Sequence, residues 1–322
     1  GDGACRIQTG VVASVRLEDF STGRVLPHEK TLPKAKEDRL ALLRACRANF
    51  SPIFAIYDGG QRGTTLLTGA VAGAEPGVQV VDGDGVTHRL FVLSDGGLHA
   101  EVAGLMADRI LYIADGHHRY ETALRYRDEM RRATGLVEAV RHEEVLMLCV
   151  DREDPGLTIL PTHRVVRDIT YELTDLITRL SVWFAVERLS FPTDDGVEDL
   201  LAHPVRAASW QRLAAEEGQR VYGLYAGGSD LYRLSRPAEP LPEGMLKGMS
   251  PASRDLDVAV LHAVAFNAVL GLDTDDGAVN EAHVAYVRDA GQAVRAVQAR
   301  EAQLAFFLNP TRIEQVSAVA AA

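Results

Sequence analysis

The amino-acid sequence predicts an α+β fold with mixed sheets, and two kinds of pattern support that prediction. Short apolar runs of strand length occur at 53–57, 110–114 and 144–150. Apolar residues recur at helical spacing over 38–50 and 120–132. Strands and helices therefore follow one another irregularly, and no internal repeat or low-complexity tract points to a solenoid or to a disordered chain.

In the first part of the chain, strand and helix signals alternate up to residue 110. Pro27 and Pro33 disfavour a helix at 25–31, so we expect this segment to be extended. The Asp- and Gly-rich residues 82–85 predict a hairpin turn. The elements expected here are a strand at 10–17, a helix at 38–50, a strand at 53–57, a hairpin at 78–93 and a helix at 97–110.

The later part of the chain begins with a strand pattern and then a turn. Residues 144–150 are apolar throughout, which suits a strand covered on both faces. The turn cluster at 151–156 predicts a junction between two domains, 1–150 and 151–322. The elements expected beyond it are a strand at 158–166, a helix at 173–183, a hairpin across 227–230, helices at 257–270 and 289–298, a strand at 304–308 and a last short helix.

Composition and charge narrow the class of protein. A chain of 322 residues with 47% hydrophobic and 25% charged residues is typical of globular proteins. Its formal net charge of −11 argues against general affinity for nucleic acid, which needs clustered positive charge. We find no signal peptide and no apolar run long enough to cross a bilayer, so we expect a cytoplasmic protein without a membrane partner.

The most informative segment has the sequence Asp-Gly-His-His-Arg and lies between the apolar run 110–114 and the helix pattern 120–132. A strand, a glycine turn and a helix N-terminus together bind anions, because the first N–H groups of a helix lack partners inside it. Gly116 would let the backbone approach a phosphate closely, and Arg119 would supply a bidentate donor. His117 or His118 could donate or shuttle a proton near neutral pH.

Two other interpretations of this segment stay open. In the first, Asp115, His117 and His118 are metal ligands, although adjacent histidines rarely point the same way and only one would bind alongside Asp115. In the second, the polar residues merely cap the helix. Two histidines and an arginine exceed what capping requires, so we favour the phosphate site.

Other polar residues are weaker candidates. Glu29 lies beside a histidine in a proline-bounded extended segment and could be a general base, or could belong to a solvated charged loop. His163 and Arg164 follow an apolar run and could add a second cationic contact. Asp257 and His262 lie five apart on a helix pattern, so we expect both to be packing residues. The dinucleotide-binding Gly-x-Gly-x-x-Gly fingerprint, the P-loop and the Gly-x-Ser-x-Gly elbow do not occur.

Six segments of the chain resemble those of a bacterial family described only as domain of unknown function 1015. The match runs in order along most of the chain. Family members usually carry further residues before this start and after this end, so we expect the chain to be a piece of a longer protein. The matching segments are 16–31, 36–39, 51–54, 112–122, 160–164 and 256–262.

The Asp-Gly-His-His-Arg segment is also distantly similar to the phosphate-binding motif of free-serine kinases in the ParB/sulfiredoxin superfamily. There, a Gly-x-x-Arg turn at a helix N-terminus holds nucleotide phosphates, and an upstream glutamate is the base toward the substrate hydroxyl. This resemblance implies a ParB/sulfiredoxin-like domain at 1–150 and a second α+β domain at 151–322. It also implies ATP or ADP with Mg²⁺ as cofactor, with Asp115 on the metal and Glu29 as base. The phosphates would be held by Asp115, Gly116, His117, His118 and Arg119, with His163 and Arg164 adding contacts.

We therefore expect a nucleotide-dependent phosphotransferase that acts on a small hydroxyl-bearing metabolite such as free serine. Its catalytic residues would be Glu29, His117, His118 and Arg119. Three alternatives stay open: a phosphohydrolase or nuclease that uses the same anion site with water as nucleophile, a nucleotide- or nucleic-acid-binding module without turnover, and a metal-dependent hydrolase. The superfamily also contains DNA-binding partition proteins, and the acidic net charge weighs against that branch.

Overall fold

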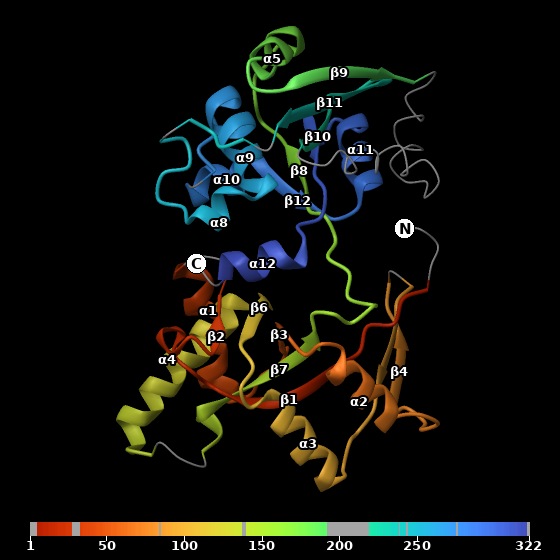
Figure 1. Cartoon of the computed structure of the whole chain (residues 1–322). Helices are drawn as coiled ribbons and strands as arrows, with labels where there is room; N and C mark the ends of the chain where they lie inside the picture. Colours follow the sequence, from red (N-terminus) through yellow and green to blue (C-terminus); the bar gives the residue numbers. More distant parts are fainter. Residues whose placement is uncertain are drawn as a thin grey trace. The chain divides into compact units, whose positions relative to one another are not determined.

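The computed structural model divides the chain into two compact units, Arg6–Thr158 and Ile159–Ala320 (Figure 1). The predicted junction lay at 150/151, but the turn that follows residue 150 belongs to the first unit. Asp151 accepts the Gly59 N–H, and Asp154 accepts the Thr64 hydroxyl, so side chains of this turn bind residues well inside that unit. The structure describes residues 5–27, 33–83, 85–136, 140–191, 219–237, 239–242, 244–274 and 276–320.

The first unit is built on a five-stranded sheet with the order β1-β7-β3-β6-β2. The β1–β7 and β3–β6 pairs are antiparallel, whereas β3–β7 and β2–β6 are parallel. The predicted α+β fold with a mixed sheet is therefore confirmed. Side chains of its middle strands form the core, where Ile53, Ile113 and Met147 are fully buried. The strands are β1 (Gly10–Arg16), β2 (Val25–Leu26), β3 (Ile53–Tyr57), β6 (Leu111–Asp115) and β7 (Glu144–Asp151).

Helices and one separate hairpin complete the first unit. The hairpin pairs β4 (Val78–Val81) with β5 (Thr87–Leu90), as the turn signal between them predicts. The long helix α4 begins directly after β6 and packs against α1. The helices are η1 (Phe20–Thr22), α1 (Pro33–Cys46), α2 (Arg62–Ala70), α3 (Gly96–Met106), α4 (His117–Thr134) and η2 (Arg141–Glu143).

The second unit contains a six-stranded sheet with the order β12-β8-β13-β10-β11-β9, and its pairs are antiparallel. Neighbouring residues of one strand point to opposite sides of a sheet. In this sheet, apolar side chains cover both faces. Phe306 lies in one hydrophobic cluster and Phe307 in another. The strands are β8 (His163–Val166), β9 (Ala185–Ser190), β10 (Gln219–Tyr225), β11 (Asp230–Pro237), β12 (Val284–Val287) and β13 (Leu304–Phe307).

Of the helices of the second unit, α10 and α11 contact the sheet directly, whereas α5 contacts η3 and α12 contacts α8. The predicted helix at 257–270 consists of α9 followed by η3, which is π-helical. Within the described ranges, none of the helices combines the length and the apolar character needed to span a membrane. The helices are α5 (Leu173–Leu180), α8 (Pro251–Arg254), α9 (Asp257–Leu261), η3 (His262–Leu270), α10 (Gly277–His283), α11 (Ala290–Gln298) and α12 (Ile313–Ala320).

Candidate functional site

The Asp-Gly-His-His-Arg segment lies where β6 passes into α4, in the predicted strand–turn–helix order (Figure 1). Gly116 is the N-cap of α4 and has a φ of 95°, a conformation that residues with a side chain rarely adopt. A glycine offers no side chain to cap the helix, and the first N–H groups of a helix have no partner inside it. The turn therefore has the backbone geometry of an anion site.

Arg119 is held in one orientation by three protein oxygens. Its Nη1 donates to the carbonyl oxygen of Pro52 at 2.6 Å and to the hydroxyl of Ser51, and its Nη2 donates to Asp115 Oδ2 at 2.6 Å. Its hydrogen bonds to described residues use these two nitrogens and leave Nε, so the guanidinium keeps donor capacity for a ligand. A donor fixed before the ligand arrives loses little entropy on binding.

The space beside this guanidinium depends on the glycine. A Cβ at position 116 would lie 2.9 Å from both Nε and Nη2 of Arg119, closer than a carbon atom can approach. The turn lines a small cavity of about 90 Å³. A water takes roughly 30 Å³ in the liquid, so the cavity holds a few waters or one phosphate-sized group. Its lining residues are Arg39, Asp115, Gly116, His117, His118 and Arg119.

Arg39 is the lining residue that the sequence did not predict. It comes from α1, and ion pairs join α1 to α4: Lys36 to Glu121 at 2.7 Å and Arg44 to Glu129 at 2.6 Å. The arginine lies in a segment, 36–39, that the family resemblance includes, which was the available signal. A second cation beside the turn raises the positive charge around the cavity.

Tyr120, the residue after Arg119, anchors the start of α4 in the core. It is fully buried, stacks on Phe20 with ring centroids 5.3 Å apart and donates to the carbonyl oxygen of Glu18 at 2.7 Å. Burial raises the pKa of Tyr120 to about 12, so its hydroxyl stays a donor at neutral pH. The start of α4 is therefore anchored in the core and to the segment that follows β1.

The two histidines of the turn differ in exposure. His117 is 2% exposed and His118 is half-buried, so His118 is the better placed of the two to meet a ligand from solvent. Glu29, the predicted base, lies outside the described residues.

The turn suits a magnesium ion carried by a nucleotide better than a metal held by protein alone. Mg²⁺ keeps several waters and binds one or two carboxylates together with substrate phosphates. The Asp115 side chain is 75% exposed, and only its Oδ2 is bound to Arg119 in the described chain. A group of three or more His, Cys, Asp or Glu side chains able to hold a metal is absent from the described residues.

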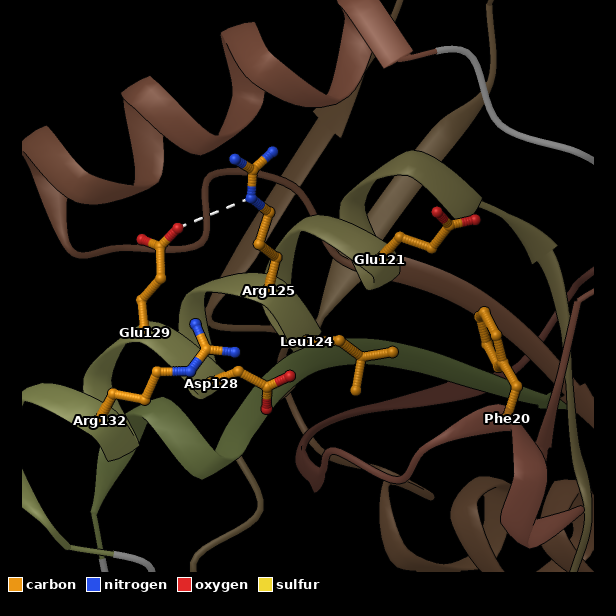
Figure 2. A pocket seen from close by; sticks show the side chains of 7 residues that line it. All are labelled: Phe20, Glu121, Leu124, Arg125, Asp128, Glu129 and Arg132. Atoms are coloured by element: carbon orange, nitrogen blue, oxygen red, sulfur yellow. Dashed lines mark ion pairs between the residues drawn. The ribbon is translucent and has the colours of Figure 1, made fainter.

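A larger hollow, of about 650 Å³, lies along α4 on the face that carries Glu121, Arg125 and Glu129 (Figure 2). Its apolar part is formed by Phe20 and Leu124, and the rest is charged. Glu129 on its wall is already bound to Arg44 and lies 3.6 Å from Arg125. The hollow lacks the fixed donors of the Arg119 turn, so we place the candidate site at the turn rather than here.

His163 and Arg164 lie in the second unit, on neighbouring positions of β8, and point to opposite faces of the sheet. His163 is 3% exposed and accepts the Leu308 N–H at 3.4 Å. Burial lowers the pKa of His163 to about 4, so it is neutral at pH 7. Arg164 donates through Nε to His262 Nε2 at 3.1 Å. The two side chains therefore face different surroundings on the two sides of the sheet.

Asp257 and His262 are expected to be packing residues, and the structure gives both polar partners. Asp257 accepts from Arg220 at 3.0 Å. His262 binds Arg164 and also lies 3.0 Å from the hydroxyl of Thr274 through Nδ1. Their role is therefore to hold buried arginines, which helical spacing alone does not reveal.

The family model "Protein of unknown function (DUF1015)" matches residues 2–259. This chain belongs to the DUF1015 family. The match includes the Asp-Gly-His-His-Arg turn and the His163–Arg164 pair. Among curated proteins, none matches the sequence.

Solved structures similar to this DUF1015 protein align along most of its length at low identity. A free serine kinase in complex with AMP covers 98% of this chain and 83% of its own, with 12% identity and a TM-score of 0.41. A conserved hypothetical protein from Pyrococcus furiosus covers 97% and 84%, with 12% identity and a TM-score of 0.38. SbnI from Staphylococcus aureus, truncated at its C-terminus, covers 96% and 76%, with 10% identity and a TM-score of 0.39.

Proposed function

We propose that the Asp-Gly-His-His-Arg turn binds the phosphates of ATP or ADP. The protein is then a nucleotide-dependent phosphotransferase whose acceptor is a small hydroxyl-bearing metabolite such as free serine. The observation that carries the proposal is the oriented Arg119 packed against an uncapped helix N-terminus, an approach that only glycine at position 116 allows. Phosphoryl transfer is mostly positioning and charge neutralisation, which is what such a turn provides.

In this mechanism the hydroxyl oxygen of the acceptor forms a bond to the terminal phosphorus, and the bond between that phosphorus and the leaving nucleotide oxygen breaks. Glu29 takes the hydroxyl proton. Arg119 and the first N–H groups of α4 stabilise the charge on the phosphoryl oxygens, with His118 as a further donor. Mg²⁺ supplies further charge neutralisation when bound, and the exposed carboxylate of Asp115 would hold it.

Nucleotide binding tests the site. Calorimetry with MgATP and MgADP should give an affinity that falls about 10- to 100-fold in Arg119→Ala, the value of a charge-assisted bidentate contact. Arg125→Ala is the matched control, because it removes the same charge from the same helix outside the turn. Equal affinities in wild type and Arg119→Ala would end the assignment of the phosphates to this turn.

Product analysis tests the reaction. With MgATP or MgADP and L-serine, ³¹P NMR should show a phosphate ester of the acceptor, and Glu29→Gln should bind the nucleotide while losing the ester. Inorganic phosphate without ester would identify a phosphohydrolase. Binding without any product would identify a nucleotide-binding module. Either of those results would replace the phosphotransferase assignment.

A further inference from the structure

Arg164 is a buried cation whose hydrogen-bond and ring partners among the described residues are neutral. The residue is 9% exposed and comes from β8 in the second unit. Its Nε donates to His262, its Nη1 donates to the carbonyl oxygen of Thr162, and its guanidinium lies 5.1 Å above the ring of Tyr286. Among the described residues, no carboxylate forms an ion pair with it, and its hydrogen bonds leave out Nη2.

Two other buried arginines of this protein form ion pairs with carboxylates. Arg127 is 2% exposed and binds Asp19 at 3.1 Å, and Arg220 is 5% exposed and binds Asp255 and Asp257. Removing a charge from water costs several kcal/mol unless a partner compensates it. Burial lowers the pKa of Arg164 to about 10. Arg220 is also buried, but its hydrogen bonds to Asp255 and Asp257 keep its pKa above the ordinary value.

The partners of Arg164 are oriented as well as neutral. Arginine can only donate, so His262 Nε2 must be the acceptor and the ring proton lies on Nδ1. That proton is donated to the Thr274 hydroxyl, which in turn donates to Asn267 Oδ1 at 3.3 Å. Burial lowers the pKa of His262 to about 3, so the ring adds no charge at neutral pH. The cluster therefore carries a single positive charge with a fixed donor direction.

From these contacts we infer that Arg164 is the anchor of a binding site for a small monocarboxylate, which its Nη2 would bind. One negative charge balances the cluster, whereas a phosphate dianion would leave an excess. Tyr286 beside it is 48% exposed, so the cluster reaches the surface on that side. His262 also begins the π-helical segment η3, and such segments are frequent at functional sites. The inference goes beyond the proposed function and uses no residue of the nucleotide turn.

The test uses the full chain and acetate as the probe. Thermal unfolding is followed by tryptophan fluorescence, because Trp183 lies in the second unit and packs against its main hydrophobic cluster. At constant ionic strength, replacing chloride with acetate at saturating concentration should raise the Tm of wild type by about 2–4 °C. Arg164→Gln should abolish this rise. Its Tm without acetate should equal or exceed that of wild type, because an uncompensated charge has been removed.

Arg220→Gln is the matched control: it should lower the Tm and keep the acetate-dependent rise, because its own carboxylates already pair that arginine. If Arg164→Gln folds poorly, titrating wild type with acetate while observing arginine side-chain ¹⁵N signals gives the same answer. The Nε signal of Arg164, assigned by its absence from the spectrum of Arg164→Lys, should shift in wild type as acetate is added. A wild type without an acetate-specific response overturns the inference, and so does a larger response to phosphate that depends on Arg164.

Discussion

Arg119 and Arg164 lie in different units of the chain and differ in whether a carboxylate compensates their charge. The guanidinium of Arg119 is half-buried, bound to the exposed carboxylate of Asp115 and to Pro52, so its charge is compensated before any ligand arrives. Arg164 lies deeper and has only neutral partners among the described residues. A compensated, oriented arginine suits a highly charged ligand that must come and go, whereas an uncompensated one is completed by a single negative charge.

The largest effect that separates paired from unpaired arginines should come from Arg220. Arg220→Gln removes the partner of Asp255 and Asp257 and a bond to the Asp255 carbonyl oxygen, so we expect a loss of about 3 kcal/mol in the free energy of unfolding. Arg164→Gln, measured by the same urea titration in chloride, should lose no stability, because its charge has no carboxylate partner among the described residues. Equal losses in the two variants would show that Arg164 is an ordinary structural arginine.

The next effect sharpens the description of the Arg119 turn. Gly116→Ala forces a methyl group against the Arg119 guanidinium at a backbone φ of 95°, so nucleotide affinity should fall at least tenfold and stability by about 1–3 kcal/mol. Calorimetry and urea unfolding measure the two quantities. Gly135→Ala is the control, because Gly135 caps the other end of α4 at a φ of 69° with nothing near its Cβ. It should lose about 1 kcal/mol in stability and no affinity.

How far the sequence predicts these features depends on how local their causes are. The apolar run 110–114, the glycine and the helix pattern after it are contiguous, so they predict the strand, turn and helix that hold Arg119. The contacts of Arg119 with Ser51 and Pro52 bridge more than sixty residues and require the pairing of β3 with β6, which no spacing reveals. Arg39 enters the cavity only because α1 packs on α4.

The second unit shows the same limit more strongly. The alternation of side chains along a strand already implies that His163 and Arg164 point apart. The partner of Arg164 could not be predicted, since His262 is 98 residues away and helical spacing predicts only that it packs. The junction was predicted at 150/151, whereas the first compact unit extends to Thr158. The turn after β7 is bound back into that unit by the carboxylates of Asp151 and Asp154.

A smaller, graded effect should appear in the second unit as the pH is lowered. The folded pKa values of His163 and His262 are about 4 and about 3, below the ordinary 6.5, because burial opposes their protonation. As the pH falls, these two histidines are therefore protonated in the unfolded chain before they are protonated in the folded one. Their contribution to the free energy of unfolding is fully present above pH 6.5 and is lost as the pH drops toward 4. Each histidine contributes a slope of up to about 1.4 kcal/mol per pH unit.

His262→Gln should remove one of these two contributions, because glutamine can still accept from Arg164 but does not titrate. Urea unfolding followed by tryptophan fluorescence between pH 7 and 5 measures the slope. His283→Gln is the matched control, since His283 is only partly buried at the end of α10 and lies outside the cluster of Arg164 and His262. An unaltered slope in His262→Gln would mean that His262 is not held neutral beside Arg164.

The smallest effect should come from Ser51→Ala, which asks how much of the Arg119 site is orientation. The variant removes one acceptor of Nη1 but keeps the Pro52 carbonyl oxygen and Asp115, so the guanidinium should stay near its place with more freedom. We expect nucleotide affinity to weaken about two- to fivefold, the value of one ordinary hydrogen bond. Ser14→Ala, which removes a hydroxyl bond to Glu144 on β7, should leave it unchanged. A loss in Ser51→Ala as large as that in Arg119→Ala would show that pre-orientation, rather than charge, makes this arginine a phosphate ligand.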